Sequence, residues 1–272
     1  MSGKRRTIFI TCIVIAVIAA GIAAYRITTD IINKKSYQNL RESVISTTEA
    51  TTSASVTASE TTAVQESETT AETTETEAPF VSPIDFVELQ AINSDIYSWL
   101  EIPDTDISYP VLQHPTELEY YLRRDLDGEY SNDGCLFTAP ENHRDMSGYN
   151  TIIYGHNLRS LAMFGTLRYY RDYDYLMEHR DITIYTPYAT FRYTVFAAVT
   201  YNDRLITSLY DFDTEEGRQG FLDSLDDIGD INSYILDDIE VGTDDHLLTL
   251  STCNSNTSQR FLVVAVLTDV EE

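Results

Sequence analysis

Short runs of apolar residues separated by polar turns fill the chain from about residue 81 onward. Each of seven runs is rich in β-branched or aromatic residues, which predicts strands over 106–113, 134–139, 151–155, 182–186, 190–201, 247–252 and 260–268. Apolar residues spaced by three and four predict helices over 83–99, 115–123, 158–164, 167–178 and 214–227. Many strands with few long helices indicate a mainly β fold, a mixed barrel with peripheral helices.

The first 80 residues follow a different pattern. Residues 7–25 carry no charge, which predicts a transmembrane anchor. The segment 1–6 before it is basic, which predicts a cytoplasmic N-terminus. A cleaved signal peptide is the alternative, because small residues at 19–21 could be cut. Residues 26–80 predict a juxtamembrane segment and then a disordered stalk rich in Thr, Ser and Glu. We therefore expect a single-pass protein of the cell membrane with its domain, residues 81–272, outside the cell.

The net charge of −26 limits the possible partners. From residue 80 onward the chain has 11 arginines and no lysine against 35 acidic residues. This composition leaves no basic stripe, so we expect no nucleic-acid partner. An acidic surface could attract amine-bearing partners, or it could simply be solvated. The acidic residues are scattered without the spacing of a ligand loop, so we expect no metal and no cofactor.

Candidate chemistry begins at the last two predicted strands. Cys253 ends one strand and Arg260 opens the next, with turn residues between them. Such a hairpin places a thiol and a guanidinium on one edge of a sheet, where a cation favours the nucleophilic thiolate. A small buried cysteine is the simpler alternative. A disulfide between Cys135 and Cys253 is also conceivable in an extracellular domain.

His156 stands out among the five histidines. It follows the predicted strand 151–155 directly, so it lies at a strand end, where side chains are rigidly held. The other four histidines are expected in loops or at element ends. His156 is therefore the candidate general acid and base.

Together, the segments Tyr154-Gly155-His156-Asn157 and Thr249-Leu250-Ser251-Thr252-Cys253, followed by Arg260, resemble the sortases, specifically class B. The resemblance extends from about residue 84 to the C-terminus and includes the predicted helix 214–227, which matches the extra helix of class B. It implies a closed eight-stranded β-barrel with an N-terminal helix and an extra helix between two late strands.

The resemblance also implies a function. Sortases are cysteine transpeptidases of bacteria with a thick cell wall. They cleave a C-terminal sorting motif of a secreted protein and join the new carboxyl end to an amine of a cell-wall precursor or to a pilin lysine. Carried over to this sequence, Cys253 is the nucleophile, His156 the general acid and base, and Arg260 the clamp for substrate and oxyanion.

Further residues are candidates for substrate binding. Tyr154 and Ser251 lie two residues before His156 and Cys253, so each shares a strand face with its catalytic neighbour. Thr252 and Asn254 flank Cys253 in the sequence, and Asn254 stands where some relatives carry an acidic residue. An asparagine that touches substrate in relatives corresponds here to Asp125 or its neighbour Arg124.

The sequence is also compatible with two other functions. The same thiol chemistry would serve a cysteine peptidase that hydrolyses its thioester. Alternatively, the domain could be a tethered, non-enzymatic β-domain that binds a wall component, with Cys253 buried.

Overall fold

The computed structural model describes residues 3–54, 80–253 and 258–272. The chain divides into two compact units, Met1–Glu42 and Ser43–Glu272. Helix α1 (Gly3–Ala54) continues into the segment that we expected to be a disordered stalk. The rest of that expected stalk, residues 55–79, lies outside the described residues.

The predicted membrane anchor over residues 7–25 is wrong. Among the described residues, no helix combines the length and the apolar character that crossing a membrane requires. The expectation of a single-pass membrane protein is corrected accordingly.

The predicted eight-stranded barrel is confirmed. Its strands are β1 (Ile96–Glu101), β2 (Ser108–Leu112), β3 (Leu136–Thr138), β4 (Asn150–Gly155), β5 (Asp181–Tyr185), β6 (Thr190–Asn202), β8 (Leu247–Cys253) and β9 (Gln259–Glu271). Their order is β5-β1-β2-β3-β4-β8-β9-β6, and pairing between β5 and β6 closes the ring. The short β7 (Tyr234–Ile235) adds to β6 outside this ring. Closure pairs the strand edges that an open sheet would leave exposed.

The opening helix is shorter than predicted. Helix α2 (Phe86–Ile92) stops where Asn93 turns the chain, because its side-chain oxygen accepts the N–H of Asp95 at 2.9 Å. Trp99, expected on the helix, lies instead in β1. It is fully buried there, and its indole N–H donates to Ser108 of β2 at 3.0 Å. Burial against the neighbouring strand outweighs the helical spacing of the apolar residues.

Two further helix predictions also fail in part. Residues 158–164 form a loop rather than a helix, and Leu161 and Met163 adopt positive φ, which a helix excludes. The predicted helix over 167–178 is two elements, the 3₁₀ helix η2 (Gly165–Arg171) and α3 (Tyr173–Glu178). They separate at Asp172, whose extended backbone allows its carboxylate to cap α3 by accepting the N–H of Tyr175. Only the 3₁₀ turn η1 (Tyr120–Arg123) forms within the predicted helix 115–123.

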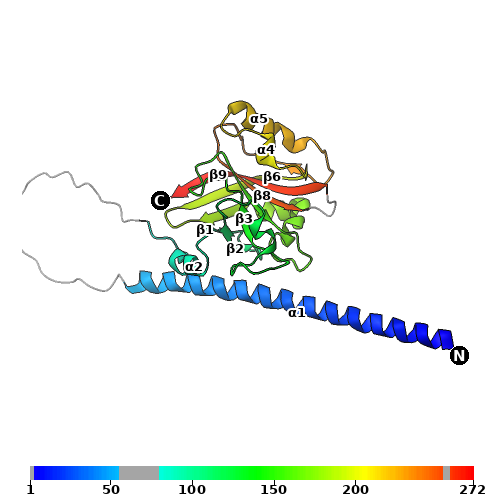
Figure 1. Cartoon of the computed structure of the whole chain (residues 1–272). Coiled ribbons are helices and arrows are strands. Elements are labelled where there is room, and N and C mark those ends of the chain that lie inside the picture. The colour runs from blue at the N-terminus through cyan, green and yellow to red at the C-terminus, as the bar shows by residue number, and fades with distance from the viewer. Residues whose placement is uncertain (1–2, 55–79, 254–257) are drawn as a thin grey trace, which may run out of the picture. The chain divides into compact units, whose positions relative to one another are not determined.

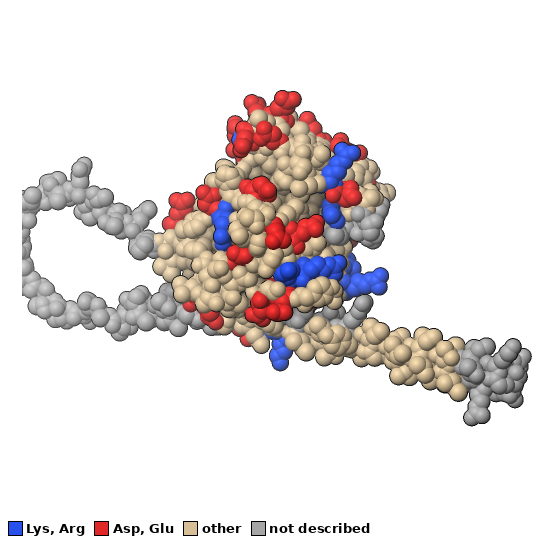
Figure 2. Space-filling view, in the orientation of Figure 1, with Lys and Arg blue, Asp and Glu red and all other residues tan. Residues whose placement is uncertain are grey.

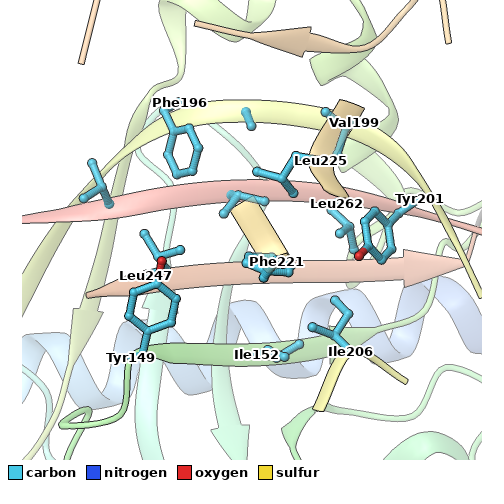
Figure 3. Packing of buried hydrophobic residues seen from close by; sticks show 13 residues of the cluster. Tyr149, Ile152, Phe196, Val199, Tyr201, Ile206, Phe221, Leu225, Leu247 and Leu262 are labelled. Atoms are coloured by element: carbon cyan, nitrogen blue, oxygen red, sulfur yellow. The ribbon is translucent and has the colours of Figure 1, made fainter. Parts of the chain in front are cut away.

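The predicted late helix forms and covers one side of the barrel. It consists of α5 (Glu215–Asp223), capped by Thr214, and of η3 (Ser224–Asp226). With the short α4 (Ile206–Leu209) it lies on the side of the barrel formed by β6, β8 and β9 (Figure 1). Figure 3 shows Phe221 and Leu225 pointing at the strands, where both are buried in one apolar cluster with Ile152, Val199 and Leu262. Burial of a phenylalanine of this kind stabilises a fold by about 2 kcal/mol.

The acidic surface predicted from the composition is visible in Figure 2. Acidic side chains spread over the face shown and gather at its top, where Figure 1 places α5. Glu215 and Glu216 lie in the first turn of α5. Carboxylates there interact favourably with the positive end of the helix dipole.

Cys135 is a buried cysteine, 2% exposed, and the described part of the chain shows no disulfide at it, so the conceivable bond to Cys253 is not observed. Its S–H donates to the backbone carbonyl of Arg124 at 3.3 Å. Cys12 is also free. The described residues contain no group of three side chains that could hold a metal ion.

Candidate active site

Three neighbouring strands, β4, β8 and β9, bring the candidate catalytic residues to one edge of the barrel, which we call the rim. The parallel pair of β4 and β8 sets Gly155 opposite Thr252, so His156 and Cys253 each follow at the same level. The antiparallel pair of β8 and β9 sets Cys253 directly opposite Arg260. Since neighbouring strands lie about 4.8 Å apart, the three backbones lie side by side. The side chain of Cys253 lies outside what the structure describes.

A cavity of about 420 Å³ opens at the rim. Its lining comes from the three strand ends, from the segment around η1 and from the connection between β6 and α4. The lining residues are Leu118, Glu119, Leu122, Arg123, Phe137, Tyr154, Gly155, His156, Tyr201, Asn202, Asp203, Arg204, Leu205, Ile206, Ser251, Thr252 and Arg260. A cavity of this size can hold a short peptide segment.

The candidate substrate residues divide into three groups. Tyr154, Ser251 and Thr252 line the cavity. Asp125 is absent from the described lining, and its carboxylate accepts the backbone N–H groups of Asp127 and Glu129 within its own turn. Asn254 lies outside the described residues.

Two hydroxyl groups of the lining are buried without a hydrogen-bond partner in the described part of the chain. They are the phenol of Tyr154 and the Oγ1 of Thr252. Burial raises the pKa of Tyr154, and the nearby charge of Arg260 opposes that rise. Tyr154 therefore stays neutral and retains a hydrogen to donate. Because an unpaired buried hydroxyl is costly, both groups are suited to a ligand that brings polar atoms into the cavity.

His156 is half-buried and held by one hydrogen bond. Its Nε2 lies 2.7 Å from the backbone carbonyl oxygen of Leu122. Burial lowers the pKa of His156 below its ordinary value of 6.5, while the bond to Leu122 opposes that effect. Arg123 lowers this pKa further and Asp133 raises it. At neutral pH the resting imidazole is therefore uncharged and able to take a proton.

The loop that follows His156 is held by Arg168 of η2. The guanidinium donates to the carbonyl oxygens of Gly165 at 2.6 Å and Leu158 at 2.7 Å, and to the side-chain oxygen of Asn157 at 2.6 Å. One cation thus satisfies three oxygens of a loop that contains two residues with positive φ. This arrangement fixes the chain on the C-terminal side of His156.

Replacing Arg168 with alanine should destabilise the protein by about 2 kcal/mol, because hydrogen bonds to a charged group contribute about 1.5–3 kcal/mol and three oxygens lose a charged donor. Urea unfolding of the full chain measures the change. Arg159→Ala in the same loop is the matched control, since Arg159 is exposed and should change stability by less than about 0.5 kcal/mol. Equal effects of the two substitutions would contradict the role given to Arg168.

Several residues of the site were not predicted from the sequence. Leu122 contributes through its backbone carbonyl, and Arg168 through a loop that was expected to be a helix. Arg123 and Arg204 line the cavity together with two acidic residues. Every residue type has a backbone carbonyl, so the sequence does not indicate that Leu122 holds His156.

A family model and several known proteins are similar to this chain. A family model described as the sortase domain matches residues 100–268, a range that includes all three rim residues. Sortase B of Staphylococcus aureus (strain NCTC 8325 / PS 47) is 34% identical over 190 residues, which are 68% of this chain and 75% of that protein. Sortase B of Listeria monocytogenes (serovar 1/2a) is 32% identical over 169 residues, which are 62% of this chain and 66% of that protein.

Among solved structures, the Staphylococcus aureus sortase B–substrate complex aligns with a TM-score of 0.60 at 32% identity. The alignment covers 68% of this chain and 84% of that one.

Proposed function

The chain belongs to the sortase family, within class B, and from this premise we propose that it is a cysteine transpeptidase with Cys253 as its nucleophile. Its first substrate is a secreted protein with a C-terminal sorting motif. Its second substrate is an amine, supplied by a cell-wall precursor or by a pilin lysine. The observation that carries the proposal is the strand register, in which Gly155 pairs with Thr252 and Cys253 pairs with Arg260 above one cavity.

In the first half of the reaction, the neutral imidazole of His156 takes the proton of the Cys253 thiol. The thiolate attacks the scissile carbonyl carbon, a C–S bond forms, and the carbonyl electrons move onto oxygen. The guanidinium of Arg260 stabilises this oxyanion with a charge that persists at any physiological pH. The C–N bond then breaks as imidazolium gives its proton to the departing amine.

In the second half of the reaction, an amine enters where the first amine left. The incoming amine attacks the thioester carbonyl, and His156 takes the proton that this amine loses. The C–S bond breaks, and the imidazolium gives this proton to the departing Cys253 sulfur, so the thiol and the neutral imidazole return. One amide replaces another, so the cycle needs no ATP, oxidant or cofactor. A thioester keeps enough reactivity for this exchange.

Buried hydroxyl groups support a peptide as the acyl donor. A peptide presents alternating N–H and C=O groups, which can pair with the hydroxyls of Tyr154 and Thr252. Because both hydroxyls are otherwise buried and unpaired among the described residues, bound peptide would relieve their cost of burial.

Product analysis tests the proposal against its alternatives. The full chain is incubated with a library of short peptides, with and without triglycine as the amine, and the products are weighed by mass spectrometry. A transpeptidase should yield a product in which the peptide's N-terminal fragment is joined to triglycine. The amount of the same fragment released as a free acid should fall as triglycine is added. Free acid alone at every triglycine concentration would favour the hydrolytic peptidase. No cleavage, together with a Cys253 thiol that resists alkylation, would favour the non-enzymatic binding domain.

A further inference from the structure

The hydrogen bond between His156 and Leu122 fixes which nitrogen of the imidazole carries a proton. The Leu122 carbonyl oxygen lies 2.7 Å from Nε2 and can only accept a hydrogen bond. Nε2 must therefore be protonated in both the neutral and the charged ring. When His156 is neutral, Nδ1 is the nitrogen without a hydrogen, so Nδ1 is the only base that the ring can offer.

The Leu122 carbonyl is itself held on both sides. Within η1, the N–H of Leu122 donates to Glu119 at 3.1 Å. The neighbouring carbonyls, of Tyr121 and Arg123, accept the N–H groups of Cys135 and Ser131, each at 3.0 Å. Backbone hydrogen bonds thus join the segment around η1 to residues 131–135. The Leu122 carbonyl lies between two of these bonded carbonyls and points toward His156.

Gly134 makes this close approach possible. Its φ is +60°, and a Cβ built there would lie 2.6 Å from the Leu122 oxygen and 2.8 Å from the Tyr121 oxygen. Both are backbone atoms, so a larger residue would have to displace the carbonyl that holds His156. Gly128, in the same region, also has positive φ, at +78°, but a Cβ there would meet only the Tyr120 hydroxyl, at 3.9 Å.

We propose that the Leu122 backbone carbonyl, given room by Gly134, is the positioning group of His156, and that it assigns proton exchange during acyl transfer to Nδ1. Leu122 and Gly134 act through His156 and do not touch the reacting atoms. The exchange of protons rests on the proposed function. The tautomer does not, because it follows from the hydrogen bond alone.

Nitrogen NMR of the ¹⁵N-labelled full chain tests the tautomer directly. Spectra of the five histidines are recorded at a pH at which the imidazoles are neutral. Comparison with the spectrum of His156→Gln identifies the signals of residue 156. The protonated and unprotonated nitrogens of a neutral imidazole have widely separated shifts. We expect Nε2 in the protonated range and Nδ1 in the unprotonated range. The reverse assignment, or an averaged pair of shifts, would overturn the proposal.

A matched pair of substitutions tests the role of Gly134. Asparagine tolerates positive φ, so Gly134→Asn and Gly128→Asn differ chiefly in the contact that the new Cβ makes with Leu122. We expect Gly134→Asn to lower kcat about 10²-fold, as a misplacement of about 1 Å can, and to populate the Nδ1–H tautomer. Gly128→Asn should change kcat by no more than about twofold.

Each outcome separates this inference from the proposed function. If Gly134→Asn folds, as seen by its thermal melt, and keeps the wild-type tautomer and kcat, the positioning role is wrong while the transpeptidase stands. If the wild-type tautomer is Nε2–H but no acyl transfer is found, the proposed function fails and the positioning of His156 remains. If Gly134→Asn does not fold, the wild-type tautomer alone decides.

Discussion

Replacing Cys253 with alanine is expected to abolish acyl transfer, lowering kcat/KM by about 10⁴-fold or more, the scale on which loss of a nucleophile acts. No thioester can form without the sulfur, and the remaining groups of the rim cannot substitute for a covalent intermediate. The fold should persist, because Cys253 ends β8 and its backbone pairs with Arg260 whatever its side chain. Rates with a cleavable peptide and triglycine, together with a thermal melt, measure both effects.

Cys135→Ala is the matched control for this substitution. It removes the same atom from a buried cysteine whose S–H donates to the backbone carbonyl of Arg124. It should lower stability by about 1 kcal/mol through the lost contact and leave kcat/KM within about twofold. Activity retained by Cys253→Ala, or lost in Cys135→Ala with the fold intact, would show that the wrong cysteine has been assigned.

Replacing Arg260 with lysine is expected to lower kcat by about 10²–10³-fold, the usual cost of losing one oxyanion donor. Lysine keeps the charge but offers a single ammonium in place of a planar fork, so it cannot reproduce two directed hydrogen bonds. The effect should fall mainly on kcat and less on KM, because the oxyanion exists only during the reaction.

Arg192→Lys is the control for this change. Arg192 lies at the other end of the paired strands β6 and β9, where its exposed guanidinium bonds Asp269 at 2.6 Å and Glu271 at 2.7 Å. Exposed ion pairs contribute at most about 1 kcal/mol, and the site is remote from the rim. An Arg260→Lys enzyme as active as Arg192→Lys would remove Arg260 from the mechanism.

The sequence was most informative where elements are buried and regular. β4, β6 and β8 begin or end within a residue of the predicted bounds, because each is a short apolar run bounded by turn residues. Motif residues at the ends of such strands can therefore be assigned to one rim from the sequence alone. The late helix was predictable for a similar reason, since Phe221, Leu222 and Leu225 mark one apolar face.

The sequence was least informative where tertiary contacts override local pattern. Trp99 fits a helical spacing but is buried in β1, and Leu161 and Met163 fit a helix but adopt positive φ in the His156 loop. The hydrogen bond from His156 to the Leu122 carbonyl uses a backbone atom, which every residue type has. The identity of residue 122 therefore does not predict this bond. The apolar stretch near the N-terminus suggested a membrane span that the described helix does not support.

The central claim is that Cys253 carries the acyl group, and trapping that intermediate tests it most directly. The full chain is mixed with a cleavable peptide without amine, quenched in acid within the first turnovers, and digested for mass spectrometry. We predict a mass increase equal to the N-terminal acyl fragment on the peptide that contains Cys253, and its loss on addition of hydroxylamine. An acyl group on Cys12 or Cys135, or cleavage with no acylated cysteine at all, would contradict the account.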